Sequence, residues 1–359
     1  LTTPDTNPST NLVFKLPQAD GSAGDLLKTD GSGALSFGTP FSNKNYIING
    51  AMQIAQRGTS STSNGFGSLD RWYNNLSGGS ATFSQETNSN PSETGGIQKY
   101  ARLNVSSSSD YTGIRQRIED VTSVPAGTVT LSFYAKGTAP AGGLYAFTTQ
   151  DFGSGGSSDV DGTPVLITSS LTSSWVRYTA QISVGSVDGK TINAGSFFQL
   201  TLSQGSNSSS TAYDLNITGV QVEAGDTATS FEHRNFGDEL ARCQRFYCKS
   251  YNHDVAPGTN TMVGSIWGRN YSNESRSANS VNVKFPVTMR ATPTVTFRGV
   301  HSGTAGKWTT GASNPNNSNT DYDVNGIYDL GSNGFNSITS ANVGAENFFG
   351  GHFEADAEI

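Results

Sequence analysis

The stretch Asn45–Gly58, "NYIINGAMQIAQRG", concentrates apolar side chains in a chain that is otherwise rich in Ser, Thr, Asn and Gly. Burial of apolar surface is the dominant favourable term in folding, so we expect a hydrophobic core to begin at this stretch. The apolar residues are Tyr46, Ile47, Ile48, Met52 and Ile54.

Length and composition restrict the class of protein. A chain of 359 residues predicts two or three domains, because single cores rarely grow beyond about 250–300 residues. Charged residues make up 14%, so uncharged polar side chains must cover most of the surface. The net charge of −7 argues against nucleic acid as a partner, because phosphate binding needs clustered Lys and Arg. No stretch is long and apolar enough to span a bilayer, so we expect no membrane insertion.

The first 40 residues predict a stalk. They carry Asp-Gly-Ser turn signals at 20–22 and 30–32, each followed by a short apolar piece. The apolar residues are too few for a core within one chain, so residues 1–40 are predicted to form an intertwined β stalk of several chains. A flexible Ser/Gly linker is the alternative, although linkers do not normally contain so many large apolar residues. They are Val13, Phe14, Leu16, Leu26, Leu27 and Phe37.

Residues 41–235 alternate apolar and polar side chains in several short stretches. In "TVTLSFYAK" the apolar set is Val129, Leu131, Phe133 and Ala135, and "WVRYTAQISV" and "FQLTLSQ" alternate in the same way. A period of two with one polar face is typical of antiparallel strands that pack on one side. Many such strands with Gly-rich turns predict a jelly-roll β-sandwich. The apolar residues change from odd-numbered to even-numbered positions across Gly219, where we expect a bulge or tight bend.

A single helix is predicted at residues 236–250. Phe236, Leu240, Cys243 and Tyr247 follow helical spacing, and Asn235 can cap the first turn. This helix would connect the sandwich to residues 251–359, which alternate again in "VNVKFPVTM" and predict a C-terminal β-sandwich tip domain. The fold class is therefore mainly β, with one short helix.

The two cysteines are expected to be reduced and structural. Cys243 and Cys248 lie five residues apart in the predicted helix, which places them on different faces and disfavours a disulfide. Two free thiols fit a protein that folds in a bacterial type of cytoplasm. Cys243 should be buried, and Cys248 should be more exposed.

Signatures of common enzymes fail in this sequence. "GSVDGKT" lacks the first glycine of a phosphate-binding loop, because position 184 is Val, and Asp188-Gly189 is better interpreted as a hairpin turn. No Gly-x-Ser-x-Gly elbow and no His-Glu-x-x-His pair is present. A glycosidase pair among the C-terminal acids stays open, although no two carboxylates are singled out.

A succession of motifs resembles the tail-fibre proteins of marine and cyanobacterial phages. In order, these are "NYIINGAMQIAQRG", "LDRWYN", "GIRQRIED", "TVTLSFYAKG", "SSWVRYTAQI", "GVQVEAGDTATSFEHR" and "ELARCQRFY". The N-terminal "LVFKLPQADGSAGDLLKTDGSGALSF", "FPVTMRATPTVTF" and the terminal "FEADAEI" are similar to the flanking parts of such fibres. Cys248 departs from the pattern, and the loops between about 300 and 350 match no part of the family.

The resemblance implies a homotrimer, located in the virion as part of a tail fibre and assembled in the host cytoplasm. It implies that the Asn45–Gly58 stretch begins the jelly-roll body after the stalk. The chain starts at Leu1 without an initiator Met or a signal peptide, so we expect upstream residues and contact with other tail components through the N-terminal side.

Three functions follow from these expectations. The first is a non-enzymatic tail fibre that attaches to the host cell surface by recognising a polysaccharide or lipopolysaccharide. The second is a fibre with weak glycan hydrolase or esterase activity. The third is a purely structural virion connector.

Aromatic residues in the polar C-terminal loops are the predicted carbohydrate-binding site. Trp308, Tyr322 and Tyr328 could stack on the apolar face of a pyranose, with Asn325 bonding its hydroxyls. Packing between subunits is the alternative for these aromatics, whereas Trp72 and Trp175 are assigned to the core or to subunit packing.

The same loop contains the first half of a calcium-binding pattern. "DYDVNG" supplies Asp321, Asp323 and Asn325, but Ser332 stands where the closing Glu is required. We therefore favour a plain acidic β-turn and expect no cofactor, with Ca²⁺ the one ion left open.

Acidic residues dominate the segment 301–359, which has a net charge of −6. Such a tip would repel an anionic host surface, so neutral aromatic contacts or bridging cations would have to supply the binding energy. This reasoning predicts that Trp308→Ala weakens binding to host cells about tenfold.

Overall fold

The computed structural model describes residues 15–18, 26–29, 33–38, 44–77, 79–107, 111–205, 212–269, 278–311, 320–340 and 348–359. The chain divides into two compact units, residues 1–44 and residues 45–359. Strands dominate both units, which confirms the predicted mainly β class.

The first unit is built on a small antiparallel hairpin. Strand β1 (Leu26–Thr29) pairs with β2 (Leu35–Gly38), and Lys15 forms a parallel bridge to Ala34. Leu27 lies opposite Phe37, and the two side chains are 53% and 41% exposed. A two-stranded sheet with an exposed apolar pair is marginally stable in water. The predicted residues Val13 and Phe14 lie outside the described part of this unit.

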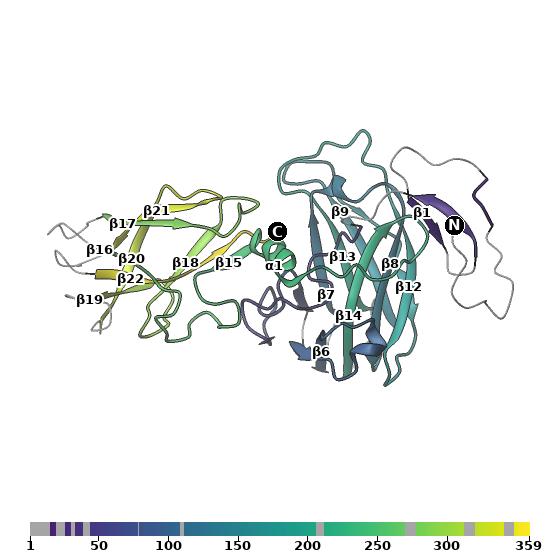
Figure 1. Ribbon diagram of the computed structural model, residues 1–359, viewed down its shortest axis with the longest axis horizontal. Helices are drawn as coiled ribbons and strands as arrows, with labels where there is room; N and C mark the ends of the chain where they lie inside the picture. Colours follow the sequence, from purple (N-terminus) through teal and green to yellow (C-terminus); the bar gives the residue numbers. More distant parts are fainter. Residues whose placement is uncertain are drawn as a thin grey trace, which may run out of the picture. The chain divides into compact units, whose positions relative to one another are not determined.

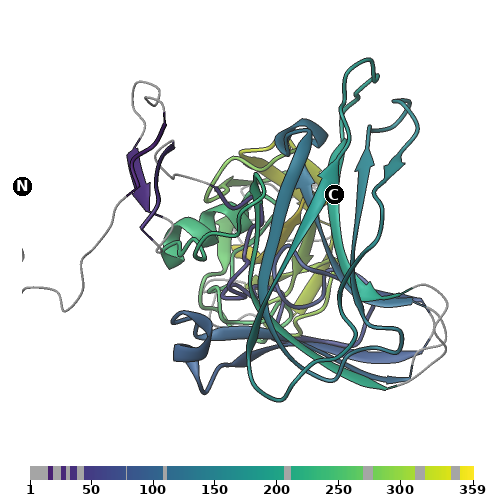
Figure 2. The same cartoon turned by 90° about the vertical axis from the view of Figure 1, so that its right-hand side faces the viewer.

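A β-sandwich of two six-stranded sheets begins the second unit, as predicted (Figure 1). One sheet has the order β10-β9-β13-β7-β4, with β11 also paired to β9, and the other has the order β12-β8-β14-β6-β5-β3. Figure 2 gives the same strands in a view turned by 90°. The strands of the sandwich are β3 (Ser60–Ser61), β4 (Tyr73–Ser77), β5 (Ser80–Thr87), β6 (Lys99–Ser107), β7 (Tyr111–Glu119), β8 (Gly127–Gly137), β9 (Leu144–Asp151), β10 (Val160–Asp161), β11 (Val165–Thr168), β12 (Val176–Val184), β13 (Phe197–Gln204) and β14 (Tyr213–Ala224).

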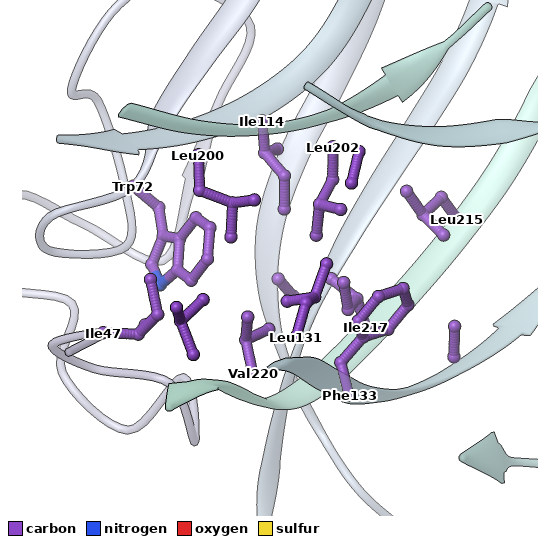
Figure 3. Packing of buried hydrophobic residues seen from close by; sticks show 14 of the residues in the cluster. Ile47, Trp72, Ile114, Leu131, Phe133, Leu200, Leu202, Leu215, Ile217 and Val220 are labelled. Carbon is purple, nitrogen blue, oxygen red and sulfur yellow. The ribbon is translucent and has the colours of Figure 1, made fainter. Parts of the chain in front are cut away.

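The alternating residues of both sheets meet in one core. Ile114, Leu200 and Leu202 come from one sheet, and Leu131 and Ile217 come from the other (Figure 3). The alternation of β8 is confirmed, because all of its predicted apolar residues are buried. Trp72 and Trp175 are buried as well, in agreement with the core assignment.

Of two predicted backbone features, the bulge is confirmed and the hairpin turn is confirmed only as a turn. The register between β14 and β8 shifts between Thr218 and Gln221, and Gly219 has a φ of +64° there, which confirms the expected bulge. Asp188-Gly189 forms a turn, closed by a hydrogen bond from the Lys190 amide to the Val187 carbonyl. This turn does not join a hairpin, because β12 and β13 lie in different sheets.

The stretch Asn45–Gly58 is an irregular loop that contributes to the sandwich core. Ile47 and Met52 are fully buried, and Figure 3 shows Ile47 beside Trp72. Asn49 holds the loop together: its side chain bonds both backbone groups of Ile54, and its carbonyl accepts a hydrogen bond from Trp72 Nε1 at 3.1 Å. Gly50 permits close approach, since a Cβ there would lie 2.2 Å from the Val220 oxygen. The prediction that a core begins here is confirmed.

Helix α1 (Phe236–Gln244) is shorter than predicted. Asn235 caps it as expected, accepting a hydrogen bond from the Asp238 amide at 2.9 Å. The predicted apolar stripe is wrong at its start, because Phe236 is 42% exposed whereas Glu239 is buried. At nine residues, the single α-helix of the described part is too short to cross a membrane.

The predicted last turn of the helix is instead the strand β15 (Tyr247–Lys249). Its three residues pair with β22 (Phe348–Asp356) and are buried. Cys248 is therefore fully buried, which corrects the expectation that it is more exposed than Cys243. Both cysteines are free, and burial raises the pKa of Cys248 to about 12.

The C-terminal strands form one curled sheet around a second core. Strand β22 pairs with both β16 and β19, so the order β22-β16-β17-β21-β20-β19 closes on itself. The second half of β22 lies between β15 and β18. The remaining strands are β16 (Ile266–Arg269), β17 (Ala278–Lys284), β18 (Thr294–Arg298), β19 (Lys307–Gly311), β20 (Thr320–Tyr328) and β21 (Gly334–Ser340).

Two arginines connect the sandwich to the end of the chain. Arg57 forms an ion pair with Asp356 at 2.9 Å and lies 3.7 Å from the ring centroid of Tyr247. Arg71 forms an ion pair with Glu358 and lies 3.4 Å from the ring centroid of Phe246. We call these four ionic residues and two rings the joint. Its residues come from four of the stretches that resemble phage fibres, 45–58, 69–74, 239–247 and 353–359, which the ion pairs bring together.

Ion pairs also change the expected charge of the C-terminal segment. Asp356 and Glu358 are neutralised at the joint, Glu354 pairs with Arg298 at 2.5 Å, and Asp323 pairs with Lys307 at 2.9 Å. Four of its seven acidic residues are therefore paired with cations. The segment is therefore less negative than the sequence count predicts, because that count ignores the partners Arg57, Arg71 and Arg298 from outside the segment.

Candidate functional site

Trp308 does not belong to a surface site. It is fully buried, its Nε1 donates a hydrogen bond to the His352 carbonyl at 2.8 Å, and its ring packs against Phe297 and Phe349. A ring without exposed surface cannot stack on a ligand. The predicted carbohydrate contact of Trp308 is therefore wrong, and the residue is part of the C-terminal core.

The other predicted carbohydrate ligands lie along β20 and are not gathered in one site. Tyr322 lies opposite Trp308 in the β19–β20 register and packs, half-buried, against the same core. Tyr328 is 52% exposed, and Asn325 is exposed as well. A neighbouring pocket of about 280 Å³ is lined by other residues, among them Lys284 and Asp329.

The calcium pattern also falls on an extended strand. Asp321 accepts hydrogen bonds from the hydroxyls of Thr309 and Ser302, and Asp323 is paired with Lys307. Both the calcium-loop and the β-turn interpretations are wrong, because pairing with β19 keeps this segment extended and these carboxylates bind protein groups. Within the described residues, no three His, Cys, Asp or Glu side chains are grouped as a metal site.

A different set of aromatic and polar side chains lies on the outer face of the β9–β13–β7 sheet. In Figure 1 these strands form the layer of the sandwich nearer to α1. Alternate residues point into the core, and the intervening residues form the opposite face. We call this surface the β9–β7 face. Its residues are Tyr73, Arg115, Arg117, Tyr145, Phe147, Phe197, Gln199, Thr201 and Ser203.

Strand register arranges these residues in rows. Phe147, Thr201, Arg115 and Tyr73 are successive partners across β9, β13, β7 and β4. Because neighbouring strands are about 4.8 Å apart, Phe147 and Arg115 lie about 10 Å from each other. The small side chain of Thr201 lies between them and is buried.

The β9 side of the face is aromatic. The ring centroids of Tyr145 and Phe147 are 6.0 Å apart, with 35° between the ring planes. Both rings line a pocket of about 160 Å³ with Gly142, Pro164 and Gly205. A Cβ at Gly205 would lie 2.7 Å from the Tyr145 ring, so glycine is what allows the backbone to approach it. Aromatic rings beside an open pocket can bind flat, partly apolar ligands.

The β7 side of the face is cationic and polar. Arg115 lies 4.1 Å from the ring centroid of Tyr73, and Arg117 lies 4.2 Å from that of Phe197. Arg117 Nε donates to Gln199 Oε1 at 3.1 Å. Burial and then the charge of Arg115 lower the pKa of Arg117 below its usual range. These contacts hold hydrogen-bond donors in fixed positions on the face.

Acidic residues lie at the far edge of the same sheet. Asp161 of β10 accepts a hydrogen bond from Thr149 Oγ1 at 2.8 Å, and Asp151 accepts one from the Gly153 amide at 2.7 Å. Burial, followed by the charges of Asp151 and Asp161, raises the pKa of Asp159. The face therefore has acidic residues on β9 and β10 and the two arginines on β7.

Sequence reasoning missed this face, although "LYAFTTQD" carried a signal. In that stretch the even positions begin with apolar residues and the odd positions begin with aromatic ones. Because side chains alternate along a strand, one of the two sets had to face away from the core. Arg115 and Arg117 alternate with the inward Ile114 and Ile118 in the same manner. The sequence could not show that these strands are neighbours.

Comparison with known proteins finds no family model and no curated protein that matches this chain. Among solved structures, a putative sugar-binding protein from Bacteroides thetaiotaomicron is 12% identical, with a TM-score of 0.32, covering 50% of this chain and 99% of that chain. A domain of tailspike protein 4 of Bacteriophage CBA120, described as enzymatically active, is 14% identical, with a TM-score of 0.31, covering 52% of this chain and 22% of that chain.

A family 11 carbohydrate-binding module from Clostridium thermocellum, in complex with a β-1,3-1,4-mixed-linked tetrasaccharide, is 14% identical, with a TM-score of 0.29. The match covers 49% of this chain and 99% of that module. Similarity at this level assigns neither a family nor a ligand to this chain.

Proposed function

We propose that the protein is a non-enzymatic phage tail-fibre component that binds a glycan of the host cell surface through the β9–β7 face. The observation that carries the proposal is the combination of paired aromatic rings with fixed amide and guanidinium groups on one sheet face. The phage assignment, with its virion location and its contact with other tail components, rests on the order of the sequence motifs.

The chemistry of the face matches that of a sugar. A pyranose has an apolar C–H surface, which an aromatic ring can cover, and a rim of hydroxyl groups that need hydrogen-bond partners. Tyr145 and Phe147 supply the rings, and Gln199 and Arg117 supply an amide and a guanidinium group beside them, whereas Thr201 is buried. Side chains that are already held in place lose less entropy when a ligand binds.

The first prediction concerns this face. The double variant Tyr145→Ala/Phe147→Ala should weaken binding to the best ligand on an array of bacterial surface polysaccharides at least tenfold, because it removes both stacking rings. Tyr328→Ala removes an exposed ring from the C-terminal strands and serves as the matched control. Affinity is measured by biolayer interferometry after each variant is shown to be folded. A loss confined to Tyr328→Ala would instead place the binding surface on β20.

The same array separates the alternatives. New reducing ends after incubation with a bound polysaccharide would replace the non-enzymatic proposal with a hydrolase. Failure of the free protein to bind any bacterial polysaccharide or to block phage adsorption would favour the purely structural connector.

The homotrimer is the second part of the proposal, and the hairpin of the first unit motivates it. Leu27 and Phe37 form an exposed apolar cross-strand pair on a sheet too small to be stable alone. We expect light scattering at micromolar concentration to give the mass of three chains. Leu27→Asp/Phe37→Asp should shift the protein toward monomer, whereas Val263→Asp, at an apolar residue that is 62% exposed, should not. A monomeric parent protein would refute the trimer; the three-fold number itself comes from the fibre resemblance.

A further inference from the structure

We infer that the β9–β7 face selects acidic glycans, with the guanidinium groups of Arg115 and Arg117 binding a carboxylate of the sugar chain. This inference rests on the proposed function and specifies the ligand class of the same face. It follows from the partners of the arginines, from their spacing and from the position of the nearest protein carboxylates.

Arg115 and Arg117 differ from most arginines of the described residues in having no ion pair there. Seven other arginines pair with Asp or Glu: Arg57, Arg71, Arg102, Arg234, Arg245, Arg290 and Arg298. Arg177 has no ion pair either, but it donates to Ser132 and to the Thr229 carbonyl. Two neighbouring cations without a carboxylate partner leave the face ready for an external anion.

The guanidinium group of Arg115 is held in place without using its hydrogen-bond donors. It lies over the ring of Tyr73, and its buried Nε has no acceptor among the residues that the structure describes. Stacking on a ring leaves the N–H groups in the guanidinium plane free to bind a planar carboxylate.

The spacing of the two arginines suits a shared anion. Arg115 and Arg117 are two residues apart on β7, and their side chains leave the same face about 7 Å apart. Charge-assisted hydrogen bonds from both sides would bind one carboxylate more strongly than neutral donors could. The lowered pKa of Arg117 fits this view, because part of the shift comes from the charge of Arg115. An anion between them would remove that repulsion.

Carboxylates around the two arginines form no ion pair with them in the described part of the chain. Asp151, on β9 of the same face, is among the charges that act on Arg117, and its carboxylate accepts a hydrogen bond from the Gly153 amide at 2.7 Å. Glu119 is engaged by Arg245 at 2.8 Å and by Arg290 at 3.6 Å. Asp161 lies three strands from Arg117 in the same row, about 14 Å away, which exceeds the screening length of about 8 Å at physiological ionic strength. An acidic sugar would therefore bind at the β7 side and a neutral neighbouring sugar at Tyr145 and Phe147.

The test uses pairs of glycans that differ only in charge. Full-length protein is titrated with oligogalacturonate and oligomannuronate and with the methyl ester of each, which keeps the sugar ring but neutralises the carboxylate. We expect at least tenfold tighter binding to one of the acids than to its ester. Arg115→Gln and Arg117→Gln should each reduce this preference toward equal binding. Arg102→Gln, which removes a cation from an exposed ion pair on the opposite sheet, should leave it unchanged.

Every other outcome of this titration would overturn the inference that the β9–β7 face selects acidic glycans. Equal binding of acid and ester would show that the face binds neutral sugars, with the proposed function intact. The same holds if neither uronate binds while a neutral polysaccharide on the array binds in a Tyr145- and Phe147-dependent manner. Binding to no glycan at all would overturn the proposed function together with this inference.

Discussion

Replacing Glu358 with leucine is expected to lower the free energy of unfolding of the 45–359 unit by about 3–5 kcal/mol. The side chain of Arg71 is 1% exposed and that of Glu358 is 5% exposed. Loss of the carboxylate leaves a buried guanidinium whose remaining hydrogen bond goes to the Arg117 carbonyl. Arg57 is affected less, because it keeps its ion pair with Asp356. Urea unfolding followed by circular dichroism measures the change.

A double variant separates the cost of an unpaired charge from the loss of side-chain packing. Arg71→Met/Glu358→Leu removes both charges and should recover most of the lost stability, because apolar residues often replace buried ion pairs at little cost. Asp214→Leu, which breaks the exposed pair with Arg102, should cost less than about 1 kcal/mol. If Glu358→Leu costs no more than Asp214→Leu, the joint does not hold the unit together.

Replacing Trp308 with alanine is expected to lower the free energy of unfolding by about 3–5 kcal/mol. The substitution empties a site between Phe297 and Phe349 and leaves the His352 carbonyl without its donor. Trp308→Phe should cost less, because it retains much of the buried volume. Tyr328→Ala, at an exposed ring, should change stability by no more than about 0.5 kcal/mol.

Glycan binding distinguishes the core role of Trp308 from the role predicted by its sequence context. Folded Trp308→Ala protein should bind the array ligand as the parent protein does, because the residue is remote from the β9–β7 face. Titration below the unfolding temperature of the variant measures this. A stable variant that has lost binding would restore Trp308 as a ligand contact and contradict the structure.

The surroundings of Trp308 show why the polar composition of residues 301–330 led to a wrong prediction of an exposed loop. Polar residues around Trp308 suggested an exposed loop, but β19 pairs with both β20 and β22, and the polar Thr309 and Asp321 bond each other within that sheet. The strand β22 lies about forty residues further along the chain. Burial of Trp308 depends on this distant pairing, which has no local signature.

The end of α1 was missed for a related reason. Residues after Gln244 continue an apolar pattern that suits a helix as well as a strand, and the periodicity alone cannot choose between them. Pairing of Tyr247 with Asp356 decides for a strand, because β22 supplies its hydrogen-bond partners. The cap at Asn235 was predictable, because capping depends on residues that are three positions apart.

The sequence by itself determined the features that depend on neighbouring residues. The alternation of Val129 to Ala135, the bulge at Gly219 and the core residues of Asn45–Gly58 all follow from local side-chain patterns. Only the tertiary structure decided which strands lie side by side. Phe147, Thr201 and Arg115 share a row although they are far apart in the chain, because the strand order of the sheet differs from the order in the sequence. The candidate site exists only through that pairing, since strand register and not sequence distance places side chains on a common face.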